Sequence, residues 1–126
     1  MNRTPCPFCN LPPERLLLET EATLAIFDAY PVTEGHALVI PKRHVASVFE
    51  LPREELDALW TQISAVRRLL ADRYSPAGFN VGINDGLAAG QTVPHAHIHV
   101  IPRRAGDTAD PRGGVRWIIP GKAKYW

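Results

Sequence analysis

The chain has 126 residues, of which 45% are hydrophobic and 21% charged, with a formal net charge of +1. These values are typical of a globular protein with a modest core, and the near-neutral charge argues against nucleic acid as an obligatory partner. No apolar run is long enough to span a membrane and no hydrophobic signal segment begins the chain, so we expect a cytoplasmic location and no membrane partner. We expect residues 1–126 to form a single domain.

Two cysteines lie close to the beginning of the chain, in the segment Cys6-Pro7-Phe8-Cys9. Such a pair is typical of a redox site or of half a zinc site. The redox interpretation is disfavoured because only five residues precede Cys6, which leaves no room for the strand that such sites follow. Zinc in a closed site takes four ligands, and histidines would supply the other two because the chain has no further cysteine. Two buried thiols without a metal are a third interpretation.

Hydrophobic patterns predict five strands, each bounded by turn-forming residues. The predicted strands are residues 15–21, 23–27, 35–41, 79–84 and 95–101. The first two are expected to form a hairpin that turns near residues 21–22, and the third has the continuous apolar centre of an interior strand.

One helix is predicted over residues 52–74, where apolar side chains recur every three or four positions. Pro52 suits the first position of a helix, because its missing N–H would be unpaired there. The predicted apolar stripe consists of Leu56, Leu59, Trp60, Ile63, Val66 and Leu70. The order of elements predicts an α+β fold, with a five-stranded, mostly antiparallel sheet and the long helix packed on one face.

Three histidines, His95, His97 and His99, alternate with apolar residues in the last predicted strand. Because side chains on a strand point to alternate faces, the three imidazoles should share one face. Alternate residues lie about 6.5–7 Å apart, which suits one site or two adjoining sites. Pro94 and Pro102 are expected to bracket the strand, since proline cannot donate a hydrogen bond in mid-strand.

The segment before this strand is rich in glycine and small residues, which let the backbone approach a ligand closely. Around it, Asn84, Gln91 and Thr92 offer neutral donors for an anion. The segment is not a P-loop, because it lacks the Gly-Lys-Ser/Thr sequence and the helix that follows it.

The assembled pattern Gly90-Gln-Thr-Val-Pro-His-Ala-His-Ile-His-Val-Ile101 resembles the histidine triad signature, His-φ-His-φ-His-φ-φ, where φ is apolar. The upstream segments Gly35-His36 and Ile40-Pro41-Lys42 and the later Asn84-Asp85-Gly86 also resemble that family. The resemblance extends from Cys6 to about Arg103. Within the family it favours bacterial members of the fragile-histidine-triad-like branch, which hydrolyse nucleotides at the α-phosphorus.

The resemblance implies a reaction. His97 matches the family's nucleophile, which would attack the α-phosphorus of a nucleoside 5′-phosphate derivative and form a nucleotidyl-histidine intermediate, from which water releases the nucleoside monophosphate. His99 would donate to a phosphoryl oxygen. The implied substrates are dinucleoside polyphosphates, adenosine 5′-phosphoramidates, or adenylylated amines and adenosine phosphosulfate. Alternatives are a binding module without turnover and a catalytic zinc held by all three triad histidines.

The resemblance also implies how the nucleotide is bound. The matching positions are Asn84, Gln91 and Thr92 for the phosphates, Asp28 for the ribose hydroxyls, Ile26 and Phe27 for the base, and His36 in a supporting role.

A structural zinc ion and a homodimer are implied as well. In related proteins a Cys-x-x-Cys pair binds zinc together with two histidines, and the matching positions here are Cys6, Cys9, His44 and His95. Residues 1–13 would then be a short, knuckle-like metal loop. The tail, residues 103–126, lies outside the family signature.

Overall fold

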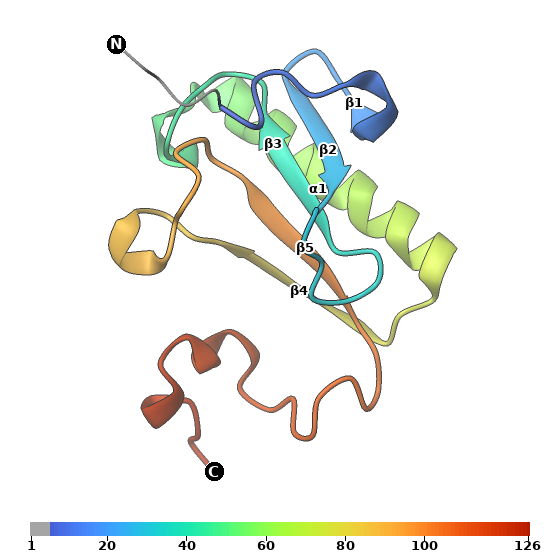
Figure 1. Cartoon of the computed structure of the whole chain (residues 1–126), viewed down its shortest axis with the longest axis vertical. Coiled ribbons are helices and arrows are strands. Elements are labelled where there is room, and N and C mark those ends of the chain that lie inside the picture. The colour runs from blue at the N-terminus through green and yellow to red at the C-terminus, as the bar shows by residue number, and fades with distance from the viewer. Residues whose placement is uncertain (1–5) are drawn as a thin grey trace.

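The computed structural model describes residues 6–126 (Figure 1). Five strands form one antiparallel sheet in the order β1-β2-β3-β5-β4. The strands are β1 (Leu16–Glu19), β2 (Thr23–Phe27), β3 (Ala37–Pro41), β4 (Gly78–Ile83) and β5 (Ile98–Arg103). The helix α1 (Arg53–Tyr74) packs on β2, β3 and β5, which confirms the predicted α+β fold. Within residues 6–126 no helix has the length and hydropathy needed to cross a membrane.

The first hairpin is close to the prediction, but β1 ends two residues earlier than expected. Thr20 leaves the ladder to close the turn: its backbone N–H donates to the carbonyl of Thr23 at 2.8 Å, and the two side-chain hydroxyls lie 2.7 Å apart. The backbone N–H and the hydroxyl of Thr20 are therefore paired with Thr23 across the turn.

Helix α1 has the predicted bounds except at its N-terminus, where Pro52 is the N-cap residue and Arg53 is the first helical residue. Leu59, Val66 and Leu70 are fully buried, but Trp60 is 52% exposed. The inclusion of Trp60 in the core stripe was therefore wrong. Neighbouring residues are separated by about 100° around a helix, so a side chain next to Leu59 points away from the sheet.

Both faces of the sheet are covered at its centre. On the α1 side lie apolar side chains from three strands, among them Ala25, Val39 and Val100. On the opposite side Ile26 and Leu38 belong to a second apolar cluster, which Phe8, Leu11 and Leu16 cover. The segment that carries Phe8 and Leu11 thus packs over part of this second face (Figure 1).

Strand β5 is shifted relative to the prediction, since it begins at Ile98 and continues through Pro102. The expectation that Pro102 ends the strand was wrong. Strand β3 pairs with β5 only between Ile98 and Val100, so at Pro102 the ladder has a partner on the β4 side alone, where it faces Phe79. A residue without an N–H is tolerated at such a position.

The tail leaves β5 and lies alongside β4 (Figure 1). It contains two short 3₁₀ helices, η4 (Gly114–Ile118) and η5 (Pro120–Lys122). Arg116 donates from Nε to the carbonyl of the buried Ala123 at 2.8 Å, which ties the two helices together.

Candidate active site and metal cluster

A cavity of about 460 Å³ lies on the sheet face opposite α1, between the N-terminal segment and the histidine run. Most of the predicted catalytic and nucleotide-binding residues line it. These are Ile26, Asp28, His36, Asn84, Thr92, His97 and His99. Residues from β2, β3, β5 and the connecting loops thus converge on one site.

The imidazole of His97 has a defined tautomer. Its Nδ1 atom lies 2.9 Å from the backbone carbonyl oxygen of His95. A carbonyl can only accept, so Nδ1 carries the proton and donates it. In the neutral ring Nε2 is then left with a free lone pair, and the His97 side chain lines the cavity. The ring of Phe8 packs edge-on against that of His97, with the centroids 5.2 Å apart.

His99 has the opposite tautomer, which His36 sets. The backbone N–H of Val32 donates to Nδ1 of His36 at 3.1 Å, so the His36 proton is on Nε2. That Nε2–H points at Nδ1 of His99, 2.9 Å away. His99 therefore accepts at Nδ1 and presents Nε2–H as a donor. Two of the three histidines that line the cavity, His97 and His99, thus offer one bare nitrogen and one N–H.

Burial keeps His36 and His99 neutral. Desolvation, helped by the nearby His97 and His36, lowers the pKa of His99 to about 4, although Asp28 opposes the shift. Burial also lowers the pKa of His36, again against the charge of Asp28. Near pH 7 both rings are therefore uncharged, as the hydrogen-bond chain requires.

Asp28 stands at the edge of the histidine pair. One carboxylate oxygen accepts the backbone N–H of Tyr30 at 2.8 Å, and the other lies 3.4 Å from Nε2 of His36. The side chain is 17% exposed and lines the cavity. It therefore keeps some acceptor capacity toward a ligand.

Phe27 does not reach the cavity, contrary to the expectation that it would contact the base. Its side chain packs on the α1 side of the sheet, with the guanidinium of Arg73 5.8 Å from the ring centroid. Because successive side chains of β2 point to opposite faces, only one of Ile26 and Phe27 can line the site. The second apolar wall is Leu38, which lies opposite Ile26 in the β2–β3 pairing.

Gln91 also has a different place from the one expected. Its Nε2 donates to the carbonyls of Ala46 at 2.8 Å and Val93 at 3.0 Å, and its Oε1 accepts the N–H of Gly86 at 2.9 Å. Both amide protons are used, so none is free for a phosphate. Gln91 is 8% exposed and holds the loop that presents Thr92.

Leu38 and Phe8 are among the cavity residues that were not predicted from the sequence. Leu38 could have been found from the sequence, because antiparallel pairing of the predicted strands 23–27 and 35–41 would give Ile26 a partner on the same face. Phe8 had no such signal, since it lies in an irregular segment whose path only the tertiary structure defines.

The four predicted metal ligands come together beside this cavity. Nδ1 of His95 lies 3.3 Å from Sγ of Cys6, 3.6 Å from Sγ of Cys9 and 3.1 Å from Nδ1 of His44. All four ligand atoms lie within 4.8 Å of one another. Tetrahedral zinc with Zn–S near 2.3 Å and Zn–N near 2.0–2.1 Å requires ligand separations of roughly 3.3–3.8 Å. The donor set is that of a zinc site, and these separations of 3.1–3.6 Å lie within a few tenths of an ångström of that range.

His95 is prepared for this role by its other nitrogen. Nε2 donates to the carbonyl oxygen of Pro41 at 2.8 Å, which leaves Nδ1 unprotonated and facing the thiols. Its side chain is fully buried, and burial lowers its pKa. His95 thus joins the two sites, since its imidazole faces the cysteines and its carbonyl holds His97.

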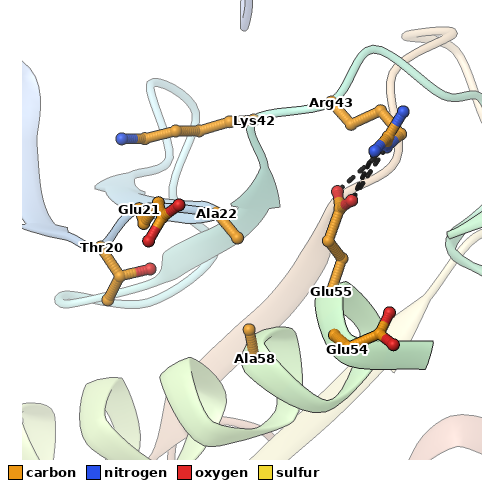
Figure 2. A pocket seen from close by; sticks show the side chains of 8 residues that line it. All are labelled: Thr20, Glu21, Ala22, Lys42, Arg43, Glu54, Glu55 and Ala58. Carbon is orange, nitrogen blue, oxygen red and sulfur yellow. Dashed lines mark hydrogen bonds and ion pairs between the residues drawn. The ribbon is translucent and has the colours of Figure 1, made fainter. Parts of the chain in front are cut away.

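A further hollow of about 550 Å³ lies between the β1–β2 turn and the beginning of α1 (Figure 2). Figure 2 shows Arg43 facing Glu55 across it, and the two form an ion pair. Lys42 pairs with Glu19 at 2.8 Å. These charges have protein partners, and none of the predicted site residues lines this hollow.

Comparison with known proteins matches this architecture. The HIT domain model matches residues 11–106. An asymmetrical bis(5′-nucleosyl)-tetraphosphatase of Schizosaccharomyces pombe is 38% identical over 96 residues, covering 76% of this chain and 53% of that protein. An adenylylsulfatase of Arabidopsis thaliana is 34% identical over 106 residues, covering 81% of this chain and 54% of that protein. The chain thus spans about half the length of these two relatives.

A solved structure is also similar, that of a zinc-bound histidine triad family protein from Mycobacterium smegmatis. It is 40% identical, with a TM-score of 0.69, and the match covers 75% of this chain and 69% of that one. The region matched by the domain model includes the whole sheet, α1 and the histidine run. This chain therefore belongs to the histidine triad (HIT) family.

Proposed function

We propose that this protein is a nucleotide hydrolase or transferase that acts at the α-phosphorus of nucleoside 5′-phosphate derivatives, with His97 as nucleophile. One observation carries the proposal: Nδ1–H of His97 donates to the carbonyl of His95 at 2.9 Å, so that in the neutral ring Nε2 has a free lone pair, in a cavity that also contains the His99 donor. A neutral imidazole is nucleophilic near pH 7.

The reaction has two steps. Nε2 of His97 attacks the phosphorus, a P–N bond forms, and the bond from phosphorus to the leaving group breaks. The carbonyl of His95 stabilises the positive charge that develops on the ring, because Nδ1–H already points at it. Water then attacks the same phosphorus, the P–N bond breaks and the nucleoside monophosphate leaves. His99 donates to a phosphoryl oxygen in both steps, a contribution commonly worth about 10²–10³ in rate.

The cavity walls suggest how the nucleotide lies. Ile26 and Leu38 offer apolar surface to the base, and Asp28 offers a carboxylate oxygen to the ribose hydroxyls. Asn84 and Thr92 are exposed in the cavity and offer neutral donors to the phosphates. We assign no nucleotide contact to Phe27, because it lies on the α1 side of the sheet. We assign none to Gln91, because its amide is engaged within the loop.

The relatives differ in what they remove from the nucleotide. A bis(5′-nucleosyl)-tetraphosphatase and an adenylylsulfatase share the nucleoside 5′-phosphoryl group and differ in the group attached to it. We therefore propose this phosphoryl group as the recognised unit, with dinucleoside polyphosphates as the first substrates to test, followed by adenosine phosphoramidates and adenosine phosphosulfate.

Zinc and a second copy of the chain complete the proposal. The Cys6, Cys9, His44 and His95 cluster would hold a structural zinc ion, and thiolate ligands of this kind suit the reducing cytoplasm. Strand β4 is at the edge of the sheet, and an edge strand can pair with the same strand of a second copy. Native mass spectrometry would report zinc content and homodimer mass together.

The deciding experiment is brief mixing of wild type and His97→Ala with diadenosine tetraphosphate, an AMP phosphoramidate and adenosine phosphosulfate. We expect wild type to release AMP and to show a transient mass increase of one nucleotidyl group, and His97→Ala to show neither. Trp60→Ala, on the exposed side of α1, is the control for folding. Equal turnover in His97→Ala would refute the role of His97.

Two other hypotheses make different predictions in the same experiment. A binding module without turnover would bind AMP but release no product from any of the three compounds. A catalytic zinc held by the whole triad would lose turnover on chelation and form no adduct; among residues 6–126 no cluster of potential ligands contains His97.

A further inference from the structure

The loop that carries the two cysteines also forms part of the cavity wall. Residues 6–9, here called the knuckle loop, place Sγ of Cys6 and Cys9 in the metal cluster. Between the cysteines, Pro7 and Phe8 line the cavity that contains His97. The Phe8 ring lies edge-on to His97 and His95, with centroid distances of 5.2 and 5.9 Å.

Few contacts other than the metal cluster hold the knuckle loop in place. In the described part of the chain, the backbone of residues 6–11 makes one hydrogen bond to other backbone, a local one from the N–H of Cys9 to the carbonyl of Cys6 at 3.3 Å. The remaining attachments are the sulfur–imidazole contacts and the partly buried side chains of Phe8 and Leu11. The position of Phe8 therefore depends on the cluster.

We propose that metal binding at Cys6, Cys9, His44 and His95 is thermodynamically coupled to nucleotide binding in the cavity, and that Phe8 transmits the coupling. This inference rests on the proposed function, since it takes the ligand of the cavity to be a nucleotide. A bound metal orders the knuckle loop, so a nucleotide that packs against Phe8 no longer has to order it.

The coupling must act in both directions. If metal strengthens nucleotide binding by some factor, nucleotide strengthens metal binding by the same factor. Couplings between sites are commonly about 5- to 150-fold, and a single aromatic wall suggests the lower part of that range, about 5- to 20-fold.

The test is calorimetric titration of the 126-residue chain with AMP, in the zinc-loaded and the metal-free state. We expect AMP to bind about 5- to 20-fold more tightly to the zinc-loaded chain. A competition titration with a zinc chelator, with and without AMP, should give the same factor for zinc. Neither measurement depends on turnover.

Phe8→Ala is the decisive variant, because it retains all four metal ligands. It should bind zinc, bind AMP more weakly than wild type in the loaded state, and show a coupling factor near one. Phe49→Ala is the matched control, since Phe49 is 74% exposed and does not line the cavity. If metal removal partly unfolded the chain, AMP binding would weaken in Phe8→Ala and Phe49→Ala alike. The test is therefore the difference in coupling factor between these two variants.

The possible failures are distinguishable. Equal AMP affinity with and without zinc overturns the coupling but leaves the proposed function intact. Coupling that persists unchanged in Phe8→Ala overturns the role of Phe8. No AMP binding by the zinc-loaded chain overturns the nucleotide function and the coupling with it.

Discussion

The Nε2 atom of His36 lies 2.9 Å from the Nδ1 atom of His99, and this contact decides which nitrogen of His99 faces the cavity as a donor. His36 is 3% exposed and is itself oriented by the backbone N–H of Val32. The nitrogen of His99 that offers an N–H to the cavity is thus set by a second histidine 63 residues earlier in the chain.

Loss of this contact should slow the reaction. We expect His36→Leu to lower kcat about 10-fold, because His99 then has no fixed tautomer, against about 10²–10³-fold for His99→Ala, which loses the donor itself. Kinetics of the double variant measure the link: in the His99→Ala background, His36→Leu should have little further effect. Thr33→Val, which loses a nearby hydrogen bond to Pro102, is the control. Fully additive effects would contradict the link.

Stability should fall in mild acid because of His99. Its pKa is about 4 in the folded chain, below the ordinary 6.5, so between these values the unfolded state binds a proton that the folded state does not. Unfolding free energy therefore decreases as pH falls from about 6.5 to 4, and is unaffected by this group above that range. Urea titrations at pH 7 and pH 5 should show a smaller loss for His99→Gln than for wild type. Equal losses would contradict the shifted pKa of His99.

Gly35 should not tolerate a side chain. Its φ is +91°, and a Cβ atom there would lie 2.7 Å from a ring carbon of Tyr74. We expect Gly35→Ala to cost about 1–3 kcal/mol in the free energy of unfolding, measured by denaturant titration. Gly78→Ala is the matched control, because a Cβ at Gly78 meets no atom within 4 Å. If Gly35→Ala left the free energy of unfolding unchanged, this would show that Tyr74 moves aside without cost.

Gln62 on α1 offers a stabilising substitution. It is 4% exposed, and its Nε2 has no hydrogen-bond partner among the described residues. A buried donor without a partner costs roughly 1–3 kcal/mol, so we expect Gln62→Leu to raise the free energy of unfolding by about 1 kcal/mol. Thermal unfolding of Gln62→Leu and Gln62→Ala compares removal of the amide with loss of volume. Destabilisation by Gln62→Leu would indicate that the amide is paired in solution.

Local patterns in the sequence were enough to predict most of the architecture. The alternation of His95, His97 and His99 with apolar residues placed the imidazoles on one face, because a strand has a side-chain period of two. The apolar stripe predicted α1 almost to the residue. The resemblance to the histidine triad signature also predicted the residues that gather in the Cys6, Cys9, His44 and His95 cluster and the histidines that line the cavity.

Only the tertiary structure decided which side chains face the site and which are already engaged. Alternation along β2 allows either Ile26 or Phe27 to face the cavity, and the packing of α1 on one face of the sheet makes the choice. Gln91 has no free amide proton for a ligand, because it donates to the carbonyl of Ala46, 45 residues away, and to that of Val93. Phe8 reaches His97 because the cysteines on either side of it contact His44 and His95, which are distant in the sequence. Such contacts depend on where distant segments meet, and a local pattern contains no information about that.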